Sequence, residues 1–260
     1  APVCIVTSLG HSPAEPSRNR TILVGLVRDA KSAMATRFEL RAPNPKSNTY
    51  LILATGYMAM LDGMKAALEA DKTPKELEAS ISKKHGEKDF YLDEDREYRS
   101  ELDVFEDFTE EERKELFGVA PATVWQNLQA FDKYPEKVEA ISGDGVFSAV
   151  SIDSYKTSIL NQWKTELYGR LIPNYLDDVR ACRKLHGEDA DEYDIAKWEE
   201  IDALKRYVAK DSADRKSLLT RAKEALDAED YNLASDIQVE LQAKREELRN
   251  LYLTYKNNLF

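Results

Sequence analysis

The segment RFELRAPNPKSNTY, residues 37–50, decides the fold of the N-terminal part of this chain. From Arg37 to Arg41 charged and apolar residues alternate, which is the period of a β-strand. Such a strand would project both arginines and Glu39 from one face. Two prolines follow, and Asn48 then opens a long apolar run. The segment therefore predicts a strand, a turn and a helix in succession.

The Arg-Glu-Arg face of the predicted strand has a definite chemistry. Guanidinium groups match carboxylate and phosphate oxygens with paired hydrogen bonds, and a carboxylate among them can hold a hard cation such as Mg2+. The alternative is a surface strand whose charges pair with their neighbours, which is a common arrangement. The local chemistry favours a site for phosphate, metal and an anionic substrate.

Motifs on both sides extend this pattern. They are Asn19-Arg20-Thr21, Arg37-x-Glu39-x-Arg41-x-Pro43-Asn44-Pro45, Asn48-x-Tyr50-Leu51 and Leu61-Asp62-Gly63-Met64-Lys65. In this order and spacing they closely resemble the glutamine synthetase family, over roughly residues 17 to 66. A weaker echo of the family's C-terminal segment lies at residues 145–155.

The resemblance implies roles for four residues. Arg20 is similar to the family arginine that contacts the transferring phosphoryl group, and Glu39 to the carboxylate ligand of a catalytic Mg2+ or Mn2+. Arg37 resembles the arginine on the nucleotide phosphates, and Arg41 the arginine that holds the carboxylate of the glutamate substrate. The implied reaction uses ATP to ligate ammonium to glutamate through a glutamyl phosphate. A related ligase acting on another amine or acid fits the same residues.

The chain departs from the family pattern at two places. Many members carry a second arginine five residues after the arginine that Arg20 resembles, whereas this chain has Gly25, and Arg28 would replace it only in a shifted register. The flap glutamate of many members has no clear counterpart, because Glu15 is the only acidic residue before Arg20. These departures concern the binding of ammonium.

The family places these motifs in the later half of its catalytic domain, after most metal ligands and ATP-site residues. No Gly-rich phosphate loop occurs in the present sequence. We therefore expect the C-terminal piece of a longer synthetase, inactive alone and binding neither metal nor ATP tightly. The resemblance also implies a homo-oligomer of stacked rings. The alternative is a non-catalytic module whose helices set oligomer contacts.

Composition excludes several classes of partner. A net charge of −11 over 260 residues argues against nucleic acid or anionic membrane as the main partner. No apolar run is expected to reach transmembrane length, so we expect a soluble cytoplasmic protein. Cys4 and Cys182 lack metal-ligand spacing and are expected to be reduced thiols.

The sequence predicts an α+β fold that is mostly α, with a few antiparallel strands near the N-terminus followed by a long helical region. Strands are expected around residues 3–7, 21–28 and 37–41. Three regions are expected, namely 1–70 as the C-terminal part of the catalytic domain, 71–150 as a charged insertion with helices, and 151–260 as a helical bundle or hairpin extension. The role of residues 71–118 is not readable.

The predicted helix over residues 48–70 contains a long apolar run and several small residues. Such a composition suits a buried helix packed closely on a sheet. Three methionines within it, Met58, Met60 and Met64, are expected to fill the core.

The C-terminal region predicts a helical hairpin. Apolar stripes over residues 214–228 and 231–257 flank the acidic turn Ala228-Glu229-Asp230, so the two helices should fold back on each other. Residues 222–241 resemble a UVR-type hairpin used for protein contacts, although intramolecular packing is the commoner meaning of such a pattern. Because the second stripe outruns the first, residues 248–260 should pack on the 151–186 helix or on a neighbouring subunit. We expect this tail to serve assembly rather than catalysis.

Overall fold

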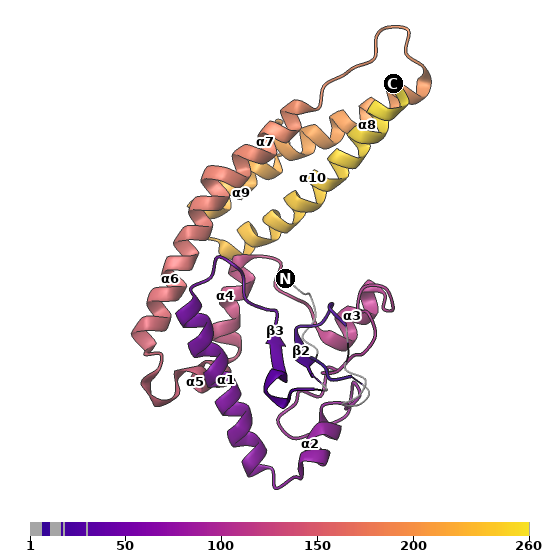
Figure 1. Ribbon diagram of the computed structural model, residues 1–260. Coiled ribbons are helices and arrows are strands. Elements are labelled where there is room, and N and C mark those ends of the chain that lie inside the picture. The colour runs from indigo at the N-terminus through magenta and orange to yellow at the C-terminus, as the bar shows by residue number, and fades with distance from the viewer. Residues whose placement is uncertain (1–6, 11–16, 18, 30, 260) are drawn as a thin grey trace. The chain divides into compact units, whose positions relative to one another are not determined.

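The computed structural model describes residues 7–10, 17, 19–29 and 31–259 (Figure 1). The chain divides into two compact units. Unit 1 comprises residues 1–120 and 136–147, and unit 2 comprises residues 121–135 and 148–260. Helices dominate, and a small three-stranded sheet lies near the N-terminus. The predicted α+β, mostly α fold class is confirmed.

The sheet of unit 1 consists of β1 (Thr7–Ser8), β2 (Val24–Val27) and β3 (Arg37–Leu40), in that order. Strand β2 runs antiparallel to β3, as expected, but β1 runs parallel to β2. The expectation of an all-antiparallel set was therefore wrong, and the sheet is mixed. The link between β1 and β2 is longer than that between β2 and β3, and parallel pairing needs such a long crossover. The predicted strand residues 3–6 lie outside the described residues.

The charged insertion supplies a further edge to this sheet. The amide of Thr7 donates to the carbonyl of Tyr98 at 2.8 Å, and the amide of Ser100 donates to the carbonyl of Thr7 at 3.0 Å. Arg99 forms a parallel bridge with the same residue of β1. Part of the segment that could not be interpreted from sequence thus pairs with β1.

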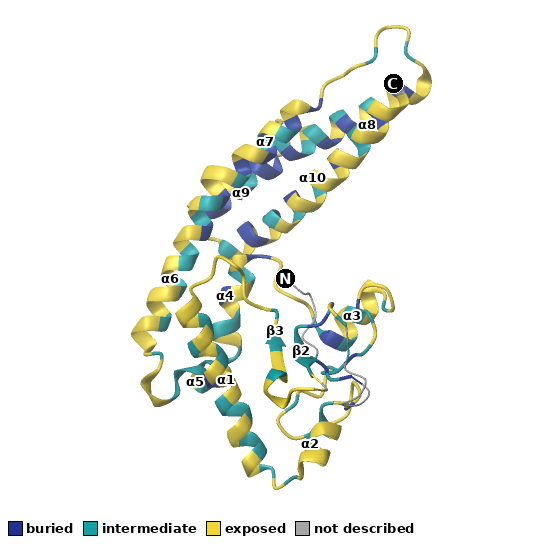
Figure 2. Cartoon of the chain, in the orientation of Figure 1, coloured by how far each residue is buried: buried dark blue, intermediate teal, exposed yellow. Residues whose placement is uncertain are grey.

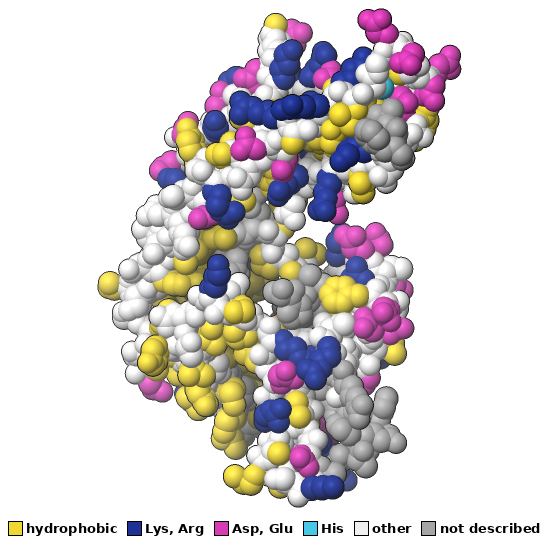
Figure 3. Space-filling model, turned by 45° about the horizontal axis from the view of Figure 1, so that its top comes forward, with side chains coloured by type: hydrophobic (Ala, Val, Ile, Leu, Met, Phe, Trp, Pro, Cys, Tyr) yellow, Lys and Arg dark blue, Asp and Glu magenta, His cyan; other side chains and the backbone are white. Residues whose placement is uncertain are grey.

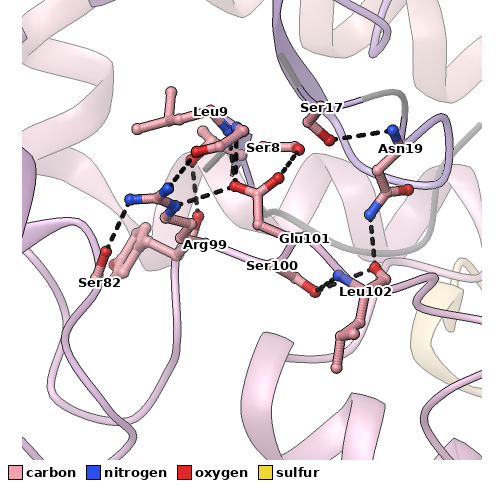
Figure 4. A network of polar contacts seen from close by, with 12 residues as sticks. Ser8, Leu9, Ser17, Asn19, Ser82, Arg99, Ser100, Glu101 and Leu102 are labelled. Atoms are coloured by element: carbon pink, nitrogen blue, oxygen red, sulfur yellow. Dashed lines mark hydrogen bonds and ion pairs between the residues drawn. The ribbon is translucent and has the colours of Figure 1, made fainter. Parts of the chain in front are cut away.

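Glu101 fastens this edge through the polar network in Figure 4. One carboxylate oxygen accepts from the amides of Leu9 and Gly10 at 3.0 and 3.1 Å, and the other accepts from the Ser8 hydroxyl at 2.6 Å. Nε of Arg99 also donates to this carboxylate, at 3.1 Å. Burial raises the pKa of Glu101, but the hydrogen bonds from Ser8, Leu9 and Arg99 outweigh it and lower the pKa overall.

Replacing Glu101 by glutamine should destabilise unit 1 at neutral pH by about 1–3 kcal/mol. Glutamine puts an NH2 group in place of one carboxylate oxygen, so the N–H or O–H groups that bonded to that oxygen lose their acceptor. The side chain is only 17% exposed, so water replaces these bonds poorly. Hydrogen exchange of the amides of Thr7 and Ser100 measures the effect. The exposed Glu106→Gln variant is the control.

The pH dependence of this difference has a defined sign. Since the pKa of Glu101 is lower in the folded chain, its contribution is fully present above the unfolded pKa. That contribution is lost as pH falls through the folded pKa. The exchange rates of the wild type and Glu101→Gln should therefore converge in acid, and a constant difference down to the lowest pH would contradict the assignment.

Helix α1 (Thr49–Glu69) begins as predicted, with the side chain of Asn48 accepting from the amides of Tyr50 and Leu51 at 3.0 and 3.3 Å. Its expected burial on the sheet was wrong. Met58 is its only buried residue, whereas Met60 and Met64 are 55% and 62% exposed (Figure 2).

Helix α1 carries an apolar face that is not covered within the described residues. Hydrophobic side chains gather over this part of unit 1 (Figure 3). Leu51 is among the large exposed ones, and six others recur at helical spacing: Tyr50, Leu53, Tyr57, Met60, Met64 and Leu68. Among the described residues no helix or strand covers this face.

By length and composition alone α1 could also cross a membrane, contrary to the expectation that no apolar run was long enough. A single such helix is weak evidence, because core helices of soluble proteins meet the same criterion. The expected lack of a membrane partner stays a prediction.

The other helices of unit 1 are short. They are α2 (Pro74–Ser80), α3 (Glu110–Phe117) and α5 (Pro135–Ser142), with the 3-10 turns η1 (Ala33–Ala35) and η2 (Gly143–Gly145). Capping boxes start α2 at Thr73 and α3 at Thr109. A small core of Ile22, Val104 and Phe117 lies beneath the sheet edge.

Unit 2 is helical throughout. Its elements are α4 (Val124–Lys133), α6 (Ala149–Glu166), the π-helical turn η3 (Leu167–Leu171), α7 (Ile172–Ala181), α8 (Glu192–Ala209), α9 (Leu218–Asp227) and α10 (Tyr231–Leu259). The π-helical turn lies just before Pro173. Proline lacks an amide donor and clashes with the preceding turn, and a π-helical turn relieves that conflict.

The predicted hairpin is formed by α9 and α10, which pack on each other and on α8. Its apolar stripes are buried, with Ala222 and Ile237 0% and 1% exposed. The end of α10 packs on α8 of the same unit, where Asn258 donates to Asp194 at 2.7 Å and the rings of Tyr255 and Trp198 lie 5.8 Å apart. Tyr255 is buried there, and its hydroxyl accepts from the amides of Leu185 and His186 at 2.9 and 3.0 Å.

Candidate functional site

Glu39 is the centre of the charged cluster predicted from the sequence. It lies on β3, and its two carboxylate oxygens face two arginines. Oε2 accepts from Nη2 of Arg41 at 3.0 Å, and Oε1 lies 3.7 Å from Nη1 of Arg20. The segment is extended, as expected, so the i and i+2 positions on β3 share a face. The structure thus brings together three of the four predicted site residues.

Arg41 is the least exposed of the three, with 18% of its side chain accessible. Nη1 donates to the backbone carbonyls of Asn19 and Ile22, at 3.0 and 3.2 Å. Together with the bond to Glu39, three of its five N–H donors are engaged within the chain. Its Nε is buried without a partner among the described residues. In this conformation Arg41 connects β3 to the turn that carries Arg20.

Arg20 points into solvent from a braced turn, with 78% of its side chain exposed. The side chain of Asn19 donates to the carbonyl of Leu102 at 2.5 Å and accepts from the amide of Thr21 at 2.9 Å. The hydroxyl of Thr21 in turn accepts from the amide of Val104 at 3.1 Å. The insertion therefore supports the turn, a role that the sequence did not reveal because more than 80 residues separate the partners.

Arg37 lies at the start of β3 and is exposed. Its Nη1 donates to the carbonyl of Ala35 at 3.2 Å. Its charge still acts on Glu39, since it is among the groups that lower the pKa of that carboxyl. An exposed guanidinium close to the cluster is free to meet an anion, but no described contact fixes it there.

The charges around Glu39 keep it ionised. The hydrogen bond and charge of Arg41 hold its pKa below the ordinary value, partial burial opposes this, and the charges of Arg20 and Arg37 lower it further. The side chain of Glu39 is 37% exposed, and the hydrogen bond from Arg41 fixes its orientation. Carboxylate oxygens are the ligand type that hard cations such as Mg2+ prefer. Among the described residues no group of three or more His, Cys, Asp or Glu side chains is arranged to hold a metal ion. The expected role of Glu39 as a metal ligand stays a prediction.

A pocket in unit 1 lies apart from this cluster, between α1 and α5. It is lined by Met58, Leu61, Asp62, Lys65, Glu136 and Glu139. None of the predicted site residues lines it. Ala140 and Gly143 complete the lining, and this mixture of acids, one lysine and apolar residues has no arrangement typical of a catalytic site.

Comparison with known proteins agrees with the resemblance drawn from the motifs. Residues 13–90 match the family described as glutamine synthetase, catalytic domain. The chain is also similar to a glutamine synthetase of Clostridium saccharobutylicum, with 31% identity over 159 residues. That alignment covers 58% of this chain and 29% of the relative. No solved structure matches the chain significantly.

Proposed function

We propose that this chain, whose residues 13–90 match the glutamine synthetase catalytic domain, is part of an ATP-dependent ligase that joins ammonium to glutamate. The observation that carries the proposal is the Glu39 cluster, which lies within the matched residues and has Arg20 and Arg41 on its two carboxylate oxygens. The chain spans less than a third of the length of the relative it matches. Reaction, substrates and assembly therefore belong to the proposal.

The proposed chemistry assigns separate tasks to the exposed groups. Arg20 would contact the phosphoryl group moving from ATP to the side chain of glutamate, where it would stabilise the charge that develops. Arg37 would bind the phosphates of the nucleotide. Glu39 would supply one carboxylate to a Mg2+ or Mn2+ ion, which neutralises phosphate charge when bound. Because Mg2+ is commonly held by one or two carboxylates together with phosphates and water, one such residue is compatible with the proposal.

The exposed face of α1 supports the view that the chain works as part of a longer synthetase. Six large apolar side chains in contact with water are costly, at about 25 cal/mol per Å2 of apolar surface. The remainder of a catalytic domain would offer a surface to cover them. The same longer protein would supply the nucleotide pocket and the other metal ligands.

Two alternatives remain. A related ligase that acts on another amine or acid would use the same arginines and carboxylate. A non-catalytic assembly module is favoured by the separate core of unit 2, which contains no predicted site residue. An assay of the longer protein with glutamate, ATP and ammonium, beside methylamine, ethylamine and aspartate, separates the first alternative from the proposal. Absence of any ATP-dependent amide formation would favour the module.

The 260-residue chain by itself should form no glutamine. The Glu39 cluster offers one metal ligand, and phosphoryl transfer depends on a complete set of metal and phosphate contacts. Glutamine is measured after incubation with ATP, Mg2+, glutamate and ammonium, with heat-treated chain as the background and the longer protein as the positive control. Glutamine above that background would contradict this prediction.

A further inference from the structure

Gly25 lies directly beside the candidate site. It is buried in β2, and its Cα is paired with that of Glu39 on β3. A glycine in the middle of a strand weakens that strand, and it often marks a place where another group approaches the backbone closely. The group that approaches here is the guanidinium of Arg41.

The space above Gly25 is filled by Arg41. A Cβ at residue 25 would lie 2.9 Å from Nη2 of Arg41 and 3.6 Å from its Cζ. A Cβ does not approach a nitrogen so closely without a shift. Since the obstructing atoms are the end of a long side chain, the guanidinium would move and the backbone of β2 would stay in place.

The position of Arg41 sets both neighbours of Glu39. Its Nη2 fixes Oε2 of the carboxylate, which leaves Oε1 turned toward Arg20. Its Nη1 holds the carbonyls of Asn19 and Ile22 on either side of that arginine's turn. Because these bonds belong to one rigid planar group, displacing the guanidinium would disturb all of them together.

We propose that Gly25 and Arg41 form a positioning pair. Because residue 25 has no side chain, the Arg41 guanidinium can lie against β2, where it orients Glu39 and the Arg20 turn. The role expected for Arg41 from the family resemblance, binding of a substrate carboxylate, is untested. In the structure Arg41 contacts Glu39 and the backbone on either side of Arg20. The inference deepens the proposed function, since it rests on the same site, but its geometry does not depend on which reaction the site performs.

A double-mutant cycle in the full chain tests the pair. Hydrogen exchange is measured at the amide of residue 41, which donates to the carbonyl of Leu23 at 2.8 Å and so reports the β2–β3 ladder. Gly25→Ala should speed this exchange in the wild-type background because it displaces the guanidinium. With Arg41→Ala already present it should slow exchange or leave it unchanged, since the obstruction is gone and alanine suits a strand better than glycine. An equal acceleration in both backgrounds would overturn the pair.

The second readout is the guanidinium itself. In the wild type, the Nη1 and Nη2 signals of Arg41 should be separate in nitrogen-edited NMR spectra, because different acceptors hold the two groups. In Gly25→Ala they should merge through free rotation, whereas in Gly56→Ala they should stay separate. Gly56 is the matched control because a Cβ there meets nothing within 4 Å. Separate signals in Gly25→Ala would also overturn the inference.

These measurements keep the inference distinct from the proposed function. If the longer protein has no ligase activity while the cycle behaves as expected, only the function fails. If the longer protein makes glutamine and the cycle shows no coupling, only the positioning pair fails. In an active longer protein, Gly25→Ala should lower turnover by about tenfold or more, in keeping with the sensitivity of catalysis to misplacement by about 1 Å. Arg41→Lys, which keeps the charge but not the fork, should retain more turnover than Arg41→Ala.

Discussion

If the proposed function holds, replacing Glu39 by alanine in the longer protein is expected to lower ligase turnover about a thousandfold. A bound metal stabilises several kcal/mol of charge in such a transition state, and each 1.36 kcal/mol corresponds to a factor of ten. Alanine removes the carboxylate and also leaves Arg20 and Arg41 without their shared partner. Turnover is measured at saturating Mg2+, and again at saturating Mn2+, so that weak binding of one ion is not mistaken for loss of the chemical step.

The matched control for Glu39→Ala is Glu78→Ala, an exposed position on α2 with no role in the site. It should retain near-normal turnover. Melting curves of both variants establish that a loss of activity is not a loss of fold. Near-normal turnover of a folded Glu39→Ala protein with Mg2+ would remove the proposed metal-ligand role.

The elements that the sequence predicted well are those set by local spacing. Alternation from Arg37 to Arg41 is enough to define β3 and to place Glu39 beside Arg41, because neighbours two apart on a strand share a face. The α9–α10 hairpin follows from two apolar stripes and a short turn.

The errors concern contacts between residues far apart in the sequence. The apolar pattern of α1 favours burial of one face, but it does not identify the surface that buries that face or say whether the surface belongs to the same chain. The direction of β1 depends on a long connection, and its pairing with residues 98–100 joins segments about 90 residues apart. No periodicity within either segment carries that information.

The candidate site shows the same division. The types and spacing of Arg20, Glu39 and Arg41 were readable, and the motifs gave them proposed roles. Two contacts could not be predicted from the sequence, namely the packing of the Arg41 guanidinium against Gly25 and the hydrogen bond from the Asn19 side chain to the carbonyl of Leu102. One signal was available, since an isolated glycine between valine and leucine in a strand marks a close approach by another group. Its partner could be identified only from the structure.

Deleting residues 212–260 should unfold unit 2. The deletion removes α9 and α10, which carry more than half of the buried residues in the core of that unit. Truncating a single buried leucine or isoleucine to alanine costs about 2–5 kcal/mol, whereas the free energy of unfolding of a whole domain is about 5–15 kcal/mol. The loss of two helices therefore removes more stability than unit 2 has. The expectation that this tail serves assembly therefore becomes secondary to its role in the core. Circular dichroism should show a loss of helix greater than the deleted residues account for, and the amides of α8 should exchange rapidly.

Two substitutions on α10 provide the graded comparison for this deletion. Ile237 is 1% exposed, so Ile237→Ala should destabilise unit 2 by about 2–5 kcal/mol. Val239 is 39% exposed, so Val239→Ala should destabilise the unit by about 0.5 kcal/mol or less. Tryptophan fluorescence reports on this unit, because Trp125, Trp163 and Trp198 all lie within it. Since the Glu39 cluster belongs to unit 1, the exchange of its β2–β3 amides should not change in Ile237→Ala. If the truncated chain kept its helix content and lost only its assembly mass, α9 and α10 would be an appended interaction element, and the core role assigned to them would be wrong.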